Sequence, residues 1–335
     1  MRVVLRRGVP FAAGAVLAVA SLSVLSGAAG RQRLNPVIDL IEQGKPVFGV
    51  YTPSPYPPGR RGGPPPTTPP KQPIELAREA LAYERGDFLF NGSMEDSVER
   101  ALPAFADFVK ATTDVGQLTK TPFRRLPHPL IIKTSKIADD PPAKVIDNIS
   151  RQLNLGTSGI MFVEAESADE VRAGLAAMRF RSKGGTRPDA VGAAPAYWGM
   201  NEQEYKTKAD LWPLNPDGEL INWTIVESRE GLAHVREIAA VKGIGVLWPG
   251  AGTLRQVFSS TNAAGERVLD QAGWENAIQQ VLAACKEFKV PCGYPANVSD
   301  IETRMKQGFS VFVMGWGEAG FSAVDIGRKM AGREP

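Results

Sequence analysis

Eight short runs of β-branched and apolar residues recur along the chain, and helical patterns lie between them. This alternation is typical of parallel α/β architecture, in which helices connect neighbouring parallel strands. The runs are residues 47–51, 88–90, 130–133, 159–163, 223–226, 244–248, 290–294 and 309–314. Eight strands with intervening helices in roughly 300 residues predict a single-domain (β/α)8 TIM barrel of the α/β class over residues 31–335.

Apolar residues at helical spacing mark the connecting segments. We expect amphipathic helices at residues 74–84, 141–155, 168–178, 230–241, 273–288 and 299–307.

Two insertions interrupt the barrel pattern. Residues 52–73 are rich in proline and glycine, which predicts an extended loop rather than a helix or a paired strand. The loop follows the first strand, so we expect it at the rim where barrel active sites form, as a lid, an oligomer arm or a surface insertion. Residues 180–220 form an aromatic-rich insertion that we expect on the same side.

The aromatic residues in and beside the second insertion have two possible uses. They could line a pocket for an aromatic substrate, but packing between subunits is the more common use of such residues and is favoured here. The residues are Tyr197, Trp198, Tyr205, Trp212 and Trp223.

The first 30 residues have the pattern of a cleaved signal peptide. Arg2, Arg6 and Arg7 precede an apolar run at 11–25, and small residues follow up to Ala29. An uncleaved membrane anchor is the less favoured alternative, because a spanning helix needs about 20 apolar residues. The sequence therefore predicts export to the periplasm, with the Arg6-Arg7 pair suggesting the twin-arginine route, and no membrane contact after cleavage.

The charge of the mature chain excludes one class of partner. Three of the 39 basic residues lie in residues 1–30, which leaves 36 basic against 36 acidic side chains. A neutral protein lacks the basic surface that nucleic acid requires, so we expect no nucleic-acid partner.

The two cysteines, Cys285 and Cys292, are too few for a disulfide framework. Export would permit a disulfide between them, but two buried free thiols are the favoured interpretation.

Two stretches of the chain carry motifs that are typical of one known protein family. Residues 159–187, GIMFVEAESADEVRAGLAAMRFRSKGGTR, resemble a segment that ends in an Arg-Tyr-Pro-Pro-x-Gly-x-Arg-Gly turn, without its double proline. Residues 226–254, VESREGLAHVREIAAVKGIGVLWPGAGTL, resemble that family's metal-site strand, the helix and the next strand. The family that these stretches resemble is the HpcH/HpaI aldolase and citrate lyase family, and weaker similarity in GDFLFNGSMEDS and VFVMGWGEAG extends the resemblance over most of the mature chain.

The resemblance implies an aldol-type lyase (an aldehyde-lyase or oxo-acid-lyase) that depends on a divalent metal, Mg²⁺ or Mn²⁺. The metal would act as a Lewis acid on a 2-oxo acid, with carboxylates at strand ends as its ligands. Acyl-CoA is cytoplasmic, so an exported member is expected to use a free 2-oxo acid or aldehyde. A homo-oligomer is also implied.

The metal ligands implied by the resemblance are incomplete. Glu227 stands at the position of the family's first metal-binding glutamate, whereas Thr253 stands where the second ligand, an aspartate, is usual. Glu164, at the end of its own strand, is the candidate replacement, and a solvated loop glutamate is the alternative interpretation of this residue. The glycine-rich turn at Gly250, Gly252 and Thr253 is expected to bind the substrate carboxylate through its backbone amides.

Two further site positions differ from the family. The chain has no histidine at the position of the family's catalytic base, and alignment of the MEDS run puts Asp96 there. Lys133 replaces the arginine that holds pyruvate, which keeps the charge but loses the bidentate fork. We therefore expect Asp96 and Lys133 as catalytic residues.

Two functions remain open. One is the metal-dependent lyase, and the other is a non-catalytic or repurposed extracytoplasmic barrel that binds a small carboxylate or an aromatic ligand. Geometry distinguishes them, because the lyase needs Glu164 and Glu227 to reach one cation.

Overall fold

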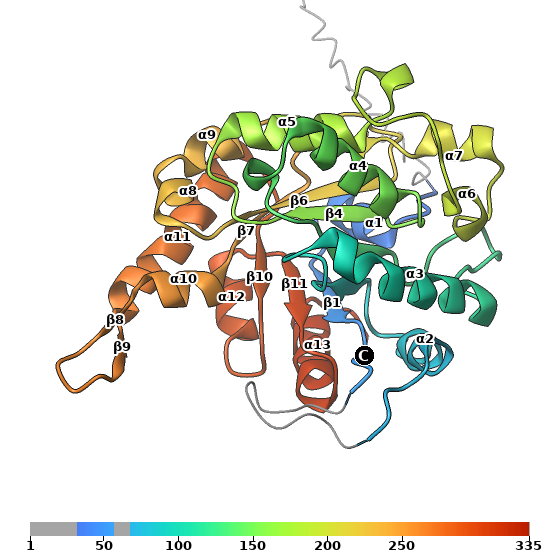
Figure 1. Cartoon of the computed structure of the whole chain (residues 1–335). Coiled ribbons are helices and arrows are strands. Elements are labelled where there is room, and N and C mark those ends of the chain that lie inside the picture. Colours follow the sequence, from blue (N-terminus) through green and yellow to red (C-terminus); the bar gives the residue numbers. More distant parts are fainter. Residues whose placement is uncertain (1–31, 57–67, 335) are drawn as a thin grey trace, which may run out of the picture. The chain divides into compact units, whose positions relative to one another are not determined.

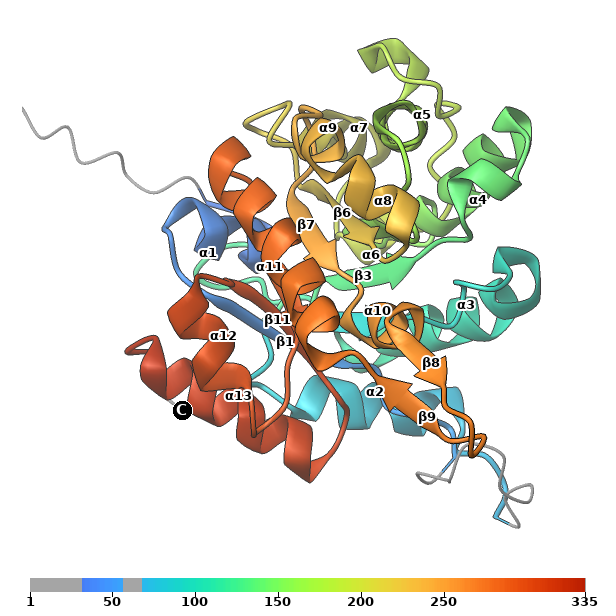
Figure 2. The same ribbon diagram turned by 90° about the vertical axis from the view of Figure 1, so that its left-hand side faces the viewer.

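Eight parallel strands curl into a closed cylinder with helices around it (Figures 1 and 2). The computed structural model describes residues 32–56 and 68–334, which lie in one compact unit, Gln32–Pro335. The eight strands are β1 (Val47–Tyr51), β2 (Leu89–Asn91), β3 (Leu130–Lys133), β4 (Gly159–Phe162), β6 (Leu220–Val226), β7 (Val246–Pro249), β10 (Gly293–Pro295) and β11 (Val311–Met314). The predicted (β/α)8 barrel is confirmed.

The cylinder closes at two junctions that sequence order alone does not specify. The first strand, β1, pairs in parallel with the last, β11, and β7 reaches β10 through a bridge between Leu247 and Cys292. A short extra strand, β5 (Leu211–Trp212), pairs with the beginning of β6. Strands β8 (Ser259–Thr261) and β9 (Arg267–Leu269) form an antiparallel hairpin that extends away from the barrel (Figures 1 and 2).

Helices follow the strands in the order that the sequence predicts. They are α2 (Pro73–Ala82), α3 (Val98–Val115), α4 (Pro142–Leu153), α5 (Ala168–Met178), α8 (Arg229–Ala233), α9 (Val235–Ala239), α10 (Ala251–Val257), α11 (Gln271–Phe288), α12 (Ile301–Gln307) and α13 (Glu318–Met330). The helix expected at 230–241 is divided at His234, and α3, α10 and α13 were not predicted. In α3, Pro103 obscures a helix that begins at the Ser97 N-cap.

The barrel interior follows the two-residue alternation of strand side chains. Aliphatic and aromatic residues from alternate positions form one buried cluster, and α1 (Pro36–Glu42) adds Val37, Ile38 and Leu40 to it. Glycines make room for the largest members: a Cβ on Gly293 would lie 1.7 Å from the ring of Trp248. The interior is therefore a packed core, not a channel.

The aromatic-rich insertion lies elsewhere than expected. It follows α5 and precedes β6, so it joins the barrel at the end where the strands begin, opposite the site. Its Tyr197, Trp198 and Tyr205 are at most 2% exposed and belong to the chain's own core, so the subunit-packing expectation is wrong for these three. Trp223 lies inside the barrel, stacked between Phe90 and Trp248.

The other insertion agrees with its prediction where it is described. Residues 52–56 and 68–72 contain neither helix nor strand, and α2 begins at Pro73. The predicted signal peptide lies outside the described residues. No helix in residues 32–56 and 68–334 has the length and apolar character that crossing a membrane requires.

The interpretation of the two cysteines as free thiols is wrong. Cys285 and Cys292 are joined by a disulfide, with their Cα atoms 5.7 Å apart. Cys285 lies near the end of α11, and Lys289, in the left-handed conformation with φ of 56°, turns the chain back toward the helix. This turn, which the cysteine spacing does not reveal, brings the two thiols together.

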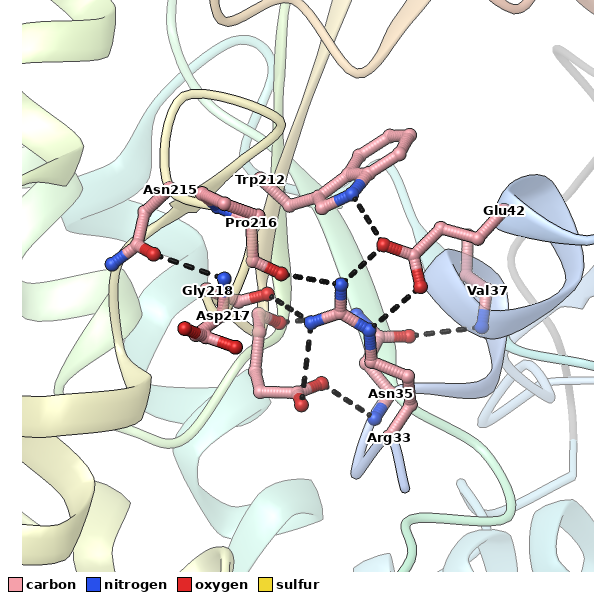
Figure 3. Close-up of polar contacts among 10 residues, drawn as sticks. Arg33, Asn35, Val37, Glu42, Trp212, Asn215, Pro216, Asp217 and Gly218 are labelled. Carbon is pink, nitrogen blue, oxygen red and sulfur yellow. Dashed lines mark hydrogen bonds and ion pairs between the residues drawn. The ribbon is translucent and has the colours of Figure 1, made fainter. Parts of the chain in front are cut away.

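A buried arginine ties the beginning of the described chain to the loop before β6 (Figure 3). The Arg33 side chain is wholly buried, binds the Glu42 carboxylate, donates to the carbonyls of Pro216 (2.6 Å) and Gly218 (3.0 Å), and lies 3.7 Å from Glu219 Oε1. Burial is the main reason why the pKa of Glu219 is raised. The network fixes α1 across the end of the barrel at which the strands begin.

Replacing Arg33 with methionine should destabilise the protein by about 3–5 kcal/mol, because the buried carboxyl group of Glu219 loses its neighbouring cation. The measurement is urea unfolding, with Arg172→Met as the matched control. Arg172 pairs with Asp169 on the surface, so its loss should change stability by less than about 0.5 kcal/mol. Equal losses in the two variants would contradict this account of the Arg33 network.

Candidate functional site

A cavity of about 210 Å³ opens at the carboxyl ends of the strands, where barrel enzymes carry their active sites. We call it the inner cavity. Five of the seven predicted site residues line it: Lys133, Glu227, Gly250, Gly252 and Thr253. Tyr51, Phe90, Met161, Ile225, Trp248, Ala251, Pro295 and Val313 complete its wall.

Strand alternation directs the side chains of Lys133 and Glu227 toward the barrel interior. Lys133 and Glu227 each stand two residues beyond a core residue, Ile131 and Ile225, so alternation directs their side chains to the same interior face. Lys133 is the last residue of β3, and Glu227 directly follows β6. Both therefore meet at the mouth of the barrel.

Glu227 is 5% exposed and is held by its neighbours. Its Oε1 atom accepts a hydrogen bond of 3.1 Å from the backbone N–H of Glu164. A Cβ on Gly250 would lie 2.3 Å from Glu227 Oε2, so only glycine leaves room for the carboxylate there. Burial raises the pKa of Glu227, against the opposing effects of the Thr253 hydroxyl, the Lys133 ammonium and the Glu164 amide.

The Lys133 ammonium pairs with the Glu95 carboxylate, which was not among the predicted site residues. Its Nζ atom lies 2.7 Å from Glu95 Oε2, and its side chain is 14% exposed. The predicted base, Asp96, is the next residue, but its side chain is 84% exposed and lies 3.6 Å from Arg100. Asp96 is turned toward the first turn of α3 and does not line the inner cavity, so the structure does not support its predicted role as the base there.

A second, outer cavity of about 390 Å³ adjoins the first and shares Glu227 with it. Asp96 and Glu164 line this outer cavity. The carboxylate of Glu164 lies 3.5 Å from Lys136 Nζ, and Lys136 also pairs with Glu166 at 3.0 Å. Glu164 contacts Glu227 through its backbone amide, not through its carboxylate.

The donor set does not fit the expected Mg²⁺ or Mn²⁺ site at Glu227 and Glu164. Hard divalent cations need several oxygen ligands, preferably carboxylates. In the described part of the chain no three His, Cys, Asp or Glu side chains converge on a point where an ion could bind. Thr253 supplies a neutral hydroxyl in place of the second carboxylate, and the ammonium groups of Lys133 and Lys136 lie beside the two glutamates.

Gly250→Ala should lower the free energy of unfolding by about 1–3 kcal/mol, because the new Cβ overlaps Glu227. Gly252→Ala is the matched control: a Cβ there meets nothing within 4 Å, and alanine is the better helix former. Thermal unfolding of both variants is the measurement. A loss of stability in Gly252→Ala alone would overturn this account of the turn.

Glu227→Gln should stabilise the protein increasingly as pH rises. Below the ordinary glutamate pKa both the folded and unfolded chains carry a neutral side chain, so the variant and the parent should unfold alike. As pH rises through the raised pKa, the parent must hold a buried carboxylate and loses stability that glutamine retains. Melting temperatures across the acidic and neutral range test this, and a difference independent of pH would refute it.

Solved structures share this fold. An HpcH/HpaI aldolase/citrate lyase family protein from Burkholderia cenocepacia matches with a TM-score of 0.59 and 19% identity, over 88% of this chain and 97% of that one. An HpcH/HpaI aldolase from Desulfitobacterium hafniense matches with 0.57 and 16%, over 89% and 97%. Macrophomate synthase matches with 0.58 and 16%, over 89% and 87%.

The sequence matches no protein-family model and no curated protein. At these low identities the structural likeness establishes the fold alone, which leaves the reaction to be argued from the site. The chain therefore has the barrel fold of HpcH/HpaI aldolase and citrate lyase structures, as the sequence resemblance implied.

Proposed function

We propose that this protein is a carbon–carbon lyase of the aldol type that acts on a small 2-oxo acid or a related hydroxy-oxo acid. The observation that carries the proposal is that an ammonium group, Lys133, and a buried carboxyl group, Glu227, line the same small cavity at the barrel mouth. The fold shared with aldolases and citrate lyases supports it.

The two groups match the demands of aldol cleavage. The reaction removes the proton of the alcohol being cleaved, and a carboxylate whose pKa lies above the ordinary glutamate value is a stronger base for that proton. A cation near the oxo group or the carboxylate favours the charge that develops as the bond breaks. Glu227 and Lys133 supply these functions, and the first turn of α10, at Gly252 and Thr253, offers backbone amides to the substrate carboxylate.

The compartment narrows the substrate class. Because the amino-terminal residues predict export, a free oxo acid is a more suitable substrate than a cytoplasmic acyl-CoA. The disulfide between Cys285 and Cys292 supports this, since disulfides persist in oxidising compartments. Fractionation of cells that make the full chain, followed by amino-terminal sequencing, tests the point.

A second candidate function is a barrel that binds a small carboxylate or aromatic ligand without turnover. It is favoured by the aromatic and aliphatic wall of the inner cavity, to which Tyr51, Phe90 and Trp248 contribute rings. Such a wall suits an aromatic ligand as well as a reacting oxo acid.

The test is a panel of 4-hydroxy-2-oxo acids, with release of the oxo acid followed by a coupled reduction. We expect cleavage that falls by about 10²-fold or more in Glu227→Gln. Cleavage should also persist in EDTA, because the donor set does not fit a divalent cation. Activity that EDTA abolishes and Mg²⁺ restores would show that the conclusion about the donor set is wrong. Thermal stabilisation by the same acids without any cleavage would favour the binding function.

A further inference from the structure

Aldol cleavage needs an electron sink next to the bond that breaks, and the site lacks the carboxylates that would hold a metal ion for this purpose. Among the described residues that line the inner cavity, Lys133 carries the one primary amine. An amine can serve as the sink by forming an imine with a carbonyl substrate. We propose that Lys133 bonds covalently to the oxo carbon of the substrate. This inference rests on the proposed function for its substrate class.

The surroundings of Lys133 restrict where its amine can go. The Lys133 Cδ atom and the rings of Tyr51 and Phe90 all lie 3.6–3.8 Å from the point where a Cβ on Gly92 would stand. Lys133, Tyr51 and Phe90 line the inner cavity together, and the Lys133 side chain is 14% exposed. The amine is therefore held beside the space in which a substrate would bind.

Two carboxyl groups stand where imine formation needs proton transfer. The Lys133 ammonium must lose a proton before its nitrogen attacks, and Glu95 Oε2, 2.7 Å from Nζ, is placed to accept it. The carbinolamine then loses its hydroxyl group as water, with a proton supplied from the Glu227 side of the cavity. Overall, an ammonium and a carbonyl give a protonated imine and one water, so no proton, electron or co-reactant is left unaccounted for.

The protonated imine then serves as the electron sink when the carbon–carbon bond is cleaved. A base removes the proton of the 4-hydroxyl group, the bond between C3 and C4 breaks to release an aldehyde, and its electron pair moves to the protonated nitrogen to form an enamine. Protonation of C3 regenerates the imine. Water hydrolyses the imine to free the 2-oxo acid and restore the Lys133 ammonium. Nothing is oxidised or reduced in this sequence.

A second lysine provides an internal comparison. Lys136 lies three residues along the chain, with a side chain that is 18% exposed, close to the value for Lys133. It pairs with both Glu164 and Glu166 and lines the outer cavity, not the inner one. The geometry therefore predicts adduct formation at Lys133 and not at Lys136.

The experiment is reductive trapping. The full chain is incubated with pyruvate and sodium cyanoborohydride, which reduces a protonated imine to a stable secondary amine, and peptides are mapped by mass spectrometry. We expect one dominant adduct on Lys133, lost in Lys133→Arg and Lys133→Met and retained in Lys136→Arg. Lys133→Arg keeps the charge beside Glu95, so its circular dichroism spectrum shows whether loss of the adduct reflects loss of the amine or of the fold.

The outcomes separate this proposal from the proposed function. Cleavage of 4-hydroxy-2-oxo acids with no adduct on Lys133 would overturn the imine and leave the lyase standing. An adduct on Lys133 without cleavage would support the imine and count against the lyase. Adducts spread equally over surface lysines, or no adduct and no cleavage, would overturn the imine.

Discussion

Parallel pairing of β6 with β7 holds Glu227 against Gly250, and the arrangement of polar groups at the barrel mouth depends on this contact. The register sets Val226 beside Pro249, so the residues that follow them, Glu227 and Gly250, lie at the same level along the barrel. A buried carboxyl group fits there because the facing residue has no side chain. Its removal from water raises the pKa of Glu227 and turns an ordinary strand-end glutamate into a group suited to proton transfer.

Closure of the barrel also decides which charged side chains share one cavity. Lys133 and Glu227 come from strands that are not neighbours, and the cylinder brings them to one cavity whose other walls are mainly apolar. The sequence resemblance implies that Lys133 takes the position of a substrate-binding arginine. At the expected cation site, Thr253 stands where the resemblance implies a second carboxylate. The Lys136 ammonium lies beside the Glu164 carboxylate there. The charged groups that line the inner cavity are the amine of Lys133 and the carboxyl group of Glu227.

Opposite the site, a different constraint operates. Arg33 joins α1 to the loop before β6 at the end where the strands begin, and its guanidinium lies beside the partly exposed Glu42 and the buried Glu219. The aromatic insertion supports the same end of the barrel from within the core. The buried Arg33 network and the candidate site thus lie at opposite ends of one cylinder, a separation that is common in barrel enzymes.

The sequence alone determined the number, order and approximate bounds of the eight barrel strands, because apolar periodicity is a local property of the chain. It also placed Lys133, Glu227 and the turn at Gly250 at strand ends, and strand ends in a parallel barrel meet. Tertiary structure alone decided which carboxylate approaches Lys133. Glu95 and Asp96 are adjacent, and the path of the loop into the α3 N-cap turns one inward and the other to solvent. The disulfide and the pairing of Glu164 with Lys136 depended likewise on contacts across loops, which spacing along the chain does not encode.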